Sequence, residues 1–265
     1  MEFLYADDAF SIFIFVVVMI VVFILLLNIL MGIITLIMDT EQVYVVKGMV
    51  PGNVSKTIQV DPKKSDGVAI DRSDNKKGIE FSWSVWINVK ELDLSNTNYL
   101  HVFNKGEQSF VSGGLNSPNN SPGLYLKANA TAHSCDLHVL MNTYNTGSSY
   151  ADTIVINNFP MSKWVNVIIR ISNKNFDVYI NGSLAMQHKL LDVPHQNYGN
   201  VNVGSNQGFN GYLSDLMYFS YALSPGKIMS INKRGPNLKM NTESASLYYA
   251  PSYLSSQWYS NNISS

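Results

Sequence analysis

A long uncharged stretch near the N-terminus constrains this chain more than any other feature. About 20 apolar residues suffice to cross the hydrocarbon core of a bilayer as a helix, and a longer run can tilt within it. The stretch therefore predicts a transmembrane helix over residues 9–38. It contains no Asp, Glu, Lys or Arg, and its apolar residues are interrupted only by Ser11, Asn28, Gly32 and Thr35.

A signal peptide and a buried core helix both fit this apolar run less well. A secretory signal peptide has an apolar region of about 7–15 residues, which follows a basic stretch and ends at a small-residue cleavage site. Here the leader, residues 1–8, is acidic, the run is longer and no Ala-x-Ala follows it. A buried helix of a soluble protein rarely continues so far without a polar face. We therefore expect an uncleaved, single-pass membrane anchor.

Asn28 is the strongly polar side chain near the middle of the run, and Gly32 lies one turn later on the same face. Two interpretations of Asn28 remain open. Its amide can bond a backbone carbonyl, or it can contact a helix of another membrane protein. Intramembrane hydrogen bonds contribute about 1 kcal/mol, so both are feasible. Asn28 and Gly32 are our candidate residues for a helix–helix contact.

The charges beside the apolar run favour a cytosolic location for the C-terminal part. The leader holds no Lys or Arg, whereas Lys47 and Lys56 follow the run, and positive residues are retained on the cytosolic side. Asn-x-Ser/Thr acceptor sites keep a lumenal location open as the alternative, although about four such sites are expected by chance from this composition. They occur at Asn53, Asn119, Asn129, Asn181 and Asn262.

Beyond residue 80 the sequence has the texture of β-strands. Residues 81–89 alternate, with aromatic and aliphatic side chains on one face, and Asn181-Gly182 suits a type I′ hairpin turn. A short helix is expected over residues 223–232, with Ser224 as its N-cap and Pro225 at its first position. Closely spaced strands without intervening helices predict a sandwich. Further strands are expected at 100–103, 124–126, 137–141, 164–171, 176–180, 183–190, 201–203 and 211–219.

Four pieces of sequence together are similar to the laminin-G-like and concanavalin A-like lectin/glucanase superfamily. They are Phe81-Ser-Trp-Ser-Val-Trp-Ile, Lys163-Trp-Val-Asn-Val-Ile-Ile, Val178-Tyr-Ile-Asn-Gly, and Gly211-Tyr-Leu-Ser-Asp-Leu-Met-Tyr-Phe followed by Ala222-Leu-Ser. The resemblance implies an all-β, two-sheet antiparallel jelly-roll sandwich, here preceded by a single transmembrane α-helix. A hydrophobic N-terminus joined to such a sandwich also resembles minor capsid and membrane proteins of large DNA viruses.

These features predict five parts in the chain. Leader, helix and sandwich differ in composition, and polar segments separate them. The parts are an acidic leader (1–8), a transmembrane helix (9–38), a juxtamembrane stalk (39–67), the sandwich (68–236) and a Ser/Asn/Tyr-rich tail (237–265).

Residue types that carry chemistry are sparse. A net charge of -1 gives no basic face for nucleic acid, and a single Cys excludes a disulfide framework. On a strand, His133 and Cys135 would share a face and His138 would point the other way, which makes a poor zinc site. The superfamily's glucanases use closely spaced carboxylates, and no two of the six Glu are close in sequence. We expect no enzyme activity, cofactor or metal.

The tail contains aromatic side chains of the kind that protein interfaces favour. A tail lying back on its own sandwich is the alternative. We expect a structural protein that links an internal membrane to a protein shell in a virion, with lipid and other structural proteins as partners. A membrane-anchored, lectin-like glycan binder is the second hypothesis. The candidate partner-binding residues of the tail are Tyr248, Tyr249, Tyr253, Trp258 and Tyr259.

Overall fold

A computed structural model of the chain forms two compact units, which divide between Gln42 and Val43. The first contains helix α1 (Ala9–Met38), and the second contains the β-strands and helix α2 (Pro225–Arg234). The five aromatic tail residues from Tyr248 to Tyr259 lie outside the described part of the chain. The structure describes residues 9–38, 42–61, 63, 67–70, 73, 78–144 and 152–241.

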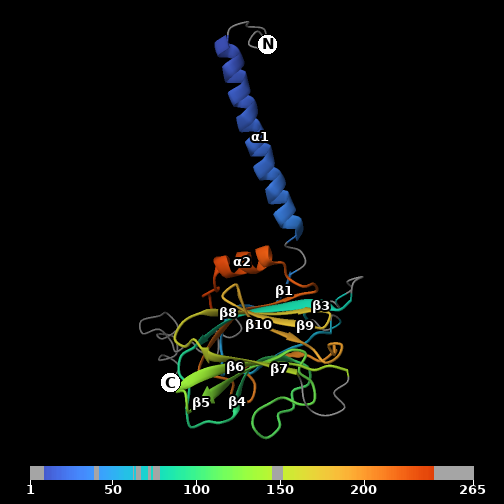
Figure 1. Cartoon of the computed structure of the whole chain (residues 1–265), viewed down its shortest axis with the longest axis vertical. Helices are drawn as coiled ribbons and strands as arrows, with labels where there is room; N and C mark the ends of the chain where they lie inside the picture. The colour runs from blue at the N-terminus through green and yellow to red at the C-terminus, as the bar shows by residue number, and fades with distance from the viewer. Residues whose placement is uncertain are drawn as a thin grey trace, which may run out of the picture. The chain divides into compact units, whose positions relative to one another are not determined.

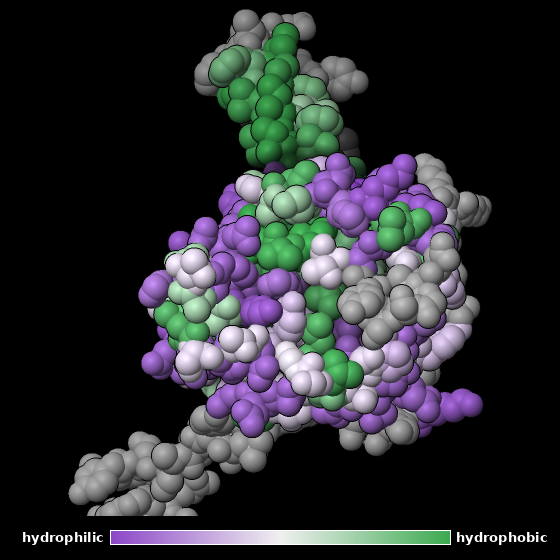
Figure 2. All heavy atoms as spheres, turned by 60° about the horizontal axis from the view of Figure 1, so that its bottom comes forward, coloured by the Kyte–Doolittle hydropathy of each residue, from purple (hydrophilic) through white to green (hydrophobic). Residues whose placement is uncertain are grey.

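Helix α1 covers the whole of the predicted apolar run. Within it, Ile12–Ile34 is long and apolar enough to cross a membrane, and none of this segment is buried inside the protein. Its apolar side chains from Ile12 to Ile34 are exposed along the whole span. The face of the sandwich seen in Figure 2 is mostly hydrophilic with scattered apolar residues. A helix that exposes apolar side chains on every side needs an apolar surrounding, and a lipid bilayer supplies one.

The second unit is a sandwich of two six-stranded sheets (Figure 1). Every pair of neighbouring strands whose register is resolved is antiparallel. This confirms the predicted fold class. The first sheet has the order β1 (Gln42–Pro51), β12 (Gly211–Phe219), β3 (Glu80–Val89), β8 (Val165–Ser172), β9 (Asn175–Ile180) and β10 (Ser183–Lys189). The second has the order β2 (Lys56–Ile58), β11 (Val201–Val203), β4 (Tyr99–Lys105), β5 (Gly123–Asn129), β6 (Ser134–Met141) and β7 (Asp152–Phe159).

The main core lies between the two sheets, as the alternation in β3 predicts. Trp83 is 1% exposed and packs against Phe103 of the second sheet, with ring centroids 5.5 Å apart. Tyr218 of β12 completes the group, at 5.0 Å from Trp83. Offset aromatic contacts of this kind add to the free energy gained by burying apolar area.

The β9–β10 hairpin and helix α2 follow their local sequence signals. Asn181 and Gly182 both have positive φ, 49° and 81°, as a type I′ turn requires. Ser224 caps α2, its hydroxyl accepting a hydrogen bond from the Lys227 N–H, and Pro225 starts the helix. Helix α2 packs on the outer side of the first sheet, where Ile228 joins a second cluster with Ile168, Met217, Phe219, Leu223 and Ile231.

Three strands differ from the sequence expectation. The sequence suggests only a short strand over residues 43–46, whereas β1 runs from Gln42 to Pro51, and β2 and β7 had no predicted counterpart. Both β1 and β2 lie within residues 39–67, so part of the expected stalk is built into the two sheets. Proline and glycine are compatible with β1 because it is an edge strand, where an interrupted hydrogen-bond ladder is tolerated.

Candidate functional site

The candidate contact residues of α1 lie within the described helix. Asn28 donates a hydrogen bond from Nδ2 to the Ile24 carbonyl oxygen at 2.8 Å. This is the first of the two interpretations that the sequence allows, because the bond is made inside the helix. Around Gly32 no other side chain of the described residues lies within 4 Å of the position that a Cβ would take. A neighbouring helix could therefore approach closely there, and a contact through Asn28 and Gly32 stays a prediction.

The start of the C-terminal segment is attached to the sandwich. The Met49 N–H donates to the Lys239 carbonyl oxygen, and the Asn241 N–H donates to the Met49 carbonyl oxygen, which places residues 239–241 beside edge strand β1. Ser214 Oγ donates to the Asn237 carbonyl oxygen at 2.7 Å. The segment therefore covers an edge that would otherwise present unpaired backbone groups. The candidate aromatic residues of the tail lie beyond this point.

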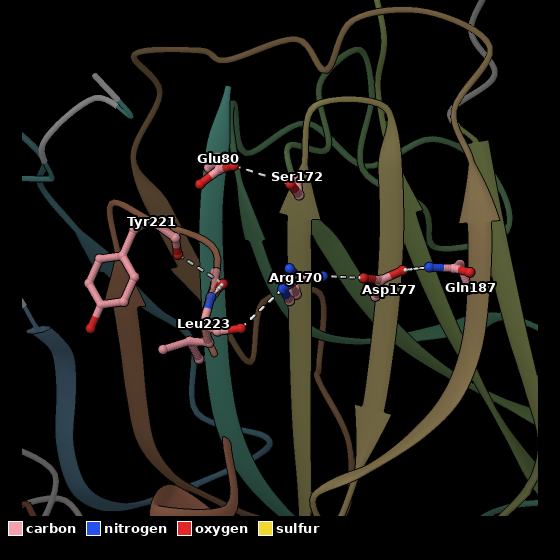
Figure 3. Close-up of polar contacts among 8 residues, drawn as sticks. Glu80, Arg170, Ser172, Asp177, Gln187, Tyr221 and Leu223 are labelled. Atoms are coloured by element: carbon pink, nitrogen blue, oxygen red, sulfur yellow. Dashed lines mark hydrogen bonds and ion pairs between the residues drawn. The ribbon is translucent and has the colours of Figure 1, made fainter. Parts of the chain in front are cut away.

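A polar row crosses the outer face of the first sheet (Figure 3). Ser82, Arg170, Asp177 and Gln187 are successive cross-strand neighbours on β3, β8, β9 and β10. Arg170 forms an ion pair with Asp177 at 2.6 Å, and Gln187 Nε2 donates to the other carboxylate oxygen. The Arg170 Nε–H also donates to the Leu223 carbonyl oxygen. The row thus fixes the segment that leads into α2, which is a structural role.

A cavity of about 110 Å³ opens at one end of the space between the sheets. Its polar lining comes from the end of β4 and from two loops, and includes Lys105, Ser121, Gln196 and Asn197. Tyr198, which is 77% exposed, also lines it. The apolar wall is formed by Val60, Ile70, Phe81, Trp83 and Tyr218.

Lys105 is the charged group in this cavity and is only 9% exposed. Its Nζ donates hydrogen bonds to the carbonyl oxygens of Asn197 (2.9 Å) and Gly199 (2.8 Å). Burial lowers the pKa of the ammonium to about 8, because the charged form loses hydration. The loop that accepts these bonds can approach β4 because residue 199 is glycine, where a Cβ would come within 2.6 Å of Gly106.

The His–Cys pattern of β6 does not converge on one point. Cys135 faces the core and His138 lies on the opposite face, packed edge-on against Tyr99 at 5.0 Å. His133 precedes the strand in a turn with φ 50°. Burial raises the pKa of the Cys135 thiol to about 12, so a thiolate is not available at neutral pH. Within the described ranges no three His, Cys, Asp or Glu side chains could hold a metal ion together.

Each of the three described glutamates accepts a hydrogen bond from a different residue. Glu80 accepts from Ser172, Glu91 from Asn210, and Glu107 from Asn119. Asp215 accepts a hydrogen bond from the Gly48 N–H at 2.8 Å and so joins β12 to β1. Each of these carboxylates thus has a local structural partner.

The fold defines a class of protein, in which a β-sandwich follows one apolar helix that could anchor it in a membrane. A family model described as the concanavalin A-like lectin/glucanases superfamily matches residues 62–229, more than half of the chain. The chain belongs to this superfamily, as the four sequence pieces predict. A search of curated proteins finds no match.

Solved structures similar to the chain include receptor-binding domains of botulinum neurotoxins. That of neurotoxin D is 15% identical with a TM-score of 0.46, and the match covers 71% of this chain and 52% of that one. The C/D mosaic serotype domain is 13% identical with a TM-score of 0.47, covering 74% and 52%. The serotype G domain is 13% identical with a TM-score of 0.46, covering 73% and 50%. This chain thus spans about half the length of these structures.

Sequence reasoning did not identify the cavity. Its residues come from segments as far apart as Val60 and Tyr218, and each looks ordinary in its own strand or loop. A lysine at a strand end, as at Lys105, normally extends into water, so its burial has no local sequence signal.

Proposed function

We propose that the chain is a non-enzymatic, membrane-anchored binding protein. The observation that carries this proposal is the division into two compact units, one a helix with an exposed apolar span and the other a folded sandwich. The helix supplies attachment to lipid, and the sandwich presents loops and edges to a partner. The separate local partners of Glu80, Glu91 and Glu107 also favour binding over glycoside hydrolysis, which needs two carboxylates flanking one bond.

The specific role that we propose is that of a minor capsid or membrane protein in a large DNA virus. In this role the helix lies in an internal membrane, and the sandwich and residues 237–265 contact a protein shell. The support is the combination of an N-terminal apolar helix with a sandwich and an aromatic tail. Assembly of a shell on the cytosolic face of a membrane agrees with the positive residues that follow the helix.

Cross-linking of membranes or particles that contain the full chain tests this role. We expect one shell protein to be cross-linked reproducibly to the sandwich, and removal of residues 242–265 to abolish the product. A deletion that begins at 242 keeps residues 239–241 on edge strand β1, so the sandwich keeps its hydrogen bonds there. An unchanged cross-link after the deletion would contradict a role for the tail.

Orientation has its own test, because Asn181 is an exposed acceptor site on the β9–β10 turn. If the sandwich is cytosolic, the chain made in a eukaryotic cell carries no glycan at this residue. Occupancy of the site, shown by a mass shift that N181Q removes, would place the sandwich in the lumen. A lumenal sandwich that also binds a glycan array would favour the lectin-like alternative, which rests on the superfamily to which the chain belongs.

A further inference from the structure

The cavity between the sheets has the size of a small organic molecule. An engineered protein cavity of about 150 Å³ takes benzene, so about 110 Å³ suits a ligand of roughly four to six non-hydrogen atoms. One wall contains the rings of Trp83 and Tyr218, which are otherwise almost fully buried. This wall favours a short aliphatic group over a fully polar ligand.

Two hydrogen-bond donors in the cavity, Ser121 Oγ and Lys105 Nζ, have no negatively charged acceptor among the described residues. Ser121 Oγ is buried and has no hydrogen-bond partner in the described part of the chain. An ammonium has three N–H donors, and Lys105 gives two of them to neutral backbone carbonyls. No ion pair joins Lys105 to a carboxylate of the described residues. A buried cation without a counter-charge is unfavourable, and a bound anion would supply that charge.

The donors are held in place before any ligand arrives. The Ser121 N–H donates to the Lys105 carbonyl oxygen at 3.0 Å, and the Lys105 N–H donates to the Pro122 carbonyl oxygen at 2.9 Å. On the other side, Asn197 Nδ2 also donates to the Lys105 carbonyl oxygen. A site whose donors are fixed in this way loses little conformational entropy on binding.

We propose that this cavity binds a small aliphatic carboxylate of two to four carbons. The carboxylate accepts hydrogen bonds from Lys105 Nζ and Ser121 Oγ, and the aliphatic part lies against Trp83 and Tyr218. All of its lining residues belong to the second compact unit, and the proposal goes beyond the proposed function.

Isothermal titration of the full chain in phosphatidylcholine nanodiscs tests the proposal, with sodium propionate as the probe at constant ionic strength. Propionamide is the matched neutral ligand, because it has the same shape without the negative charge. The variants are K105M and S121A, and K90M is the control, since Lys90 lies over the Tyr212 ring outside the cavity. Circular dichroism shows whether each variant is folded.

We expect one propionate per chain, with a Kd of about 1 mM or below, and at least tenfold weaker binding of propionamide. K105M should weaken propionate binding at least tenfold and S121A at least threefold, whereas K90M leaves it unchanged. Equal binding of propionate and propionamide would overturn the proposal, and so would folded K105M and S121A proteins that bind like the parent. If K105M does not fold, S121A and the propionamide comparison decide.

Discussion

Lys105 and Asn197 are joined by two hydrogen bonds that run in opposite directions. Lys105 Nζ donates to the Asn197 carbonyl oxygen at 2.9 Å, and Asn197 Nδ2 donates to the Lys105 carbonyl oxygen at 3.0 Å. The side chain of each residue therefore bonds the backbone of the other, across 92 positions of sequence. This pair fixes the loop around residue 197 to the end of β4 and shapes the cavity.

Asn197→Ala should lower the free energy of unfolding of the sandwich by about 1–3 kcal/mol. The change leaves the Gly199 N–H without its acceptor and removes one of two hydrogen bonds to the Lys105 carbonyl oxygen, which keeps the Ser121 N–H. Urea unfolding followed by tryptophan fluorescence measures the change. Asn210→Ala is the matched control, since the Asn210 amide makes only a long, exposed bond of 3.4 Å to Glu91. Its expected cost is below about 0.5 kcal/mol.

Removing Arg170 and removing Asp177 should lower the free energy of unfolding by different amounts, although both changes break the same ion pair. The Asp177 side chain is 2% exposed and that of Arg170 is 26% exposed. Arg170→Met leaves a buried carboxylate with only Gln187 as a partner, and we expect a loss of about 3 kcal/mol. Asp177→Asn leaves a cation that can reach water, so its cost should be smaller.

The same unfolding measurement compares these two variants with Lys174→Met, which breaks an exposed pair with Asp192. That control should cost less than about 1 kcal/mol. Equal losses for Arg170→Met and Asp177→Asn would show that burial of the carboxylate does not decide the stability of the row.

His101 should make the sandwich less stable in mild acid. The Ser205 N–H donates to its Nδ1 and its Nε2 bonds Asn104 Oδ1, so the buried ring is held neutral. Desolvation lowers its pKa to about 4, well below the ordinary 6.5. Between these pH values the unfolded chain binds more protons than the folded one, so stability is lost as pH falls. We expect a loss of about 2 kcal/mol between pH 7 and pH 5.

Unfolding of His101→Gln at both pH values checks this assignment, because the variant should lose most of the difference. His133→Gln removes a histidine from an exposed turn and should keep the pH dependence of the parent. A His101→Gln protein with the full pH dependence would assign the effect to other groups.

The predicted helix–helix contact can be tested with a photo-cross-linking residue at position 25, on the face that Asn28 and Gly32 share. If a partner helix bonds Asn28, Asn28→Leu should reduce the cross-linked product about fivefold, the equivalent of about 1 kcal/mol. Val22→Leu is the control within the same span. An undiminished product would leave Asn28 with its bond to the Ile24 carbonyl oxygen alone.

The sequence predicts those parts of the fold that depend on interactions between residues close together in the chain. The turn at Asn181-Gly182 and the cap at Ser224 depend on a few neighbouring residues, and both form as expected. Strand β3 was predictable because its large apolar side chains alternate along the chain, although Ser82 and Ser84 on its other face are buried as well. Strand β7 was not, since only Ile154 and Phe159 of this edge strand are buried. Three-residue β2 is too short to show a period.

The cavity could not be predicted in the same way. Lys105, Ser121 and Asn197 meet only because β4 and two loops converge at one end of the sandwich. Lys105 and Ser121 are unusual only because they are buried, and their burial has no local sequence signal. The Arg170–Asp177 pair has the same origin, because its residues face each other through the β8–β9 register.

Mass spectrometry of the chain recovered from alkaline-washed membranes tests the central claim most directly. The wash removes proteins held only by contacts with other proteins, whereas an apolar helix in the bilayer resists it. We predict that the chain stays with the membranes and that its mass includes residues 9–38. A product that begins after Met38 and is recovered in the soluble fraction would contradict the account.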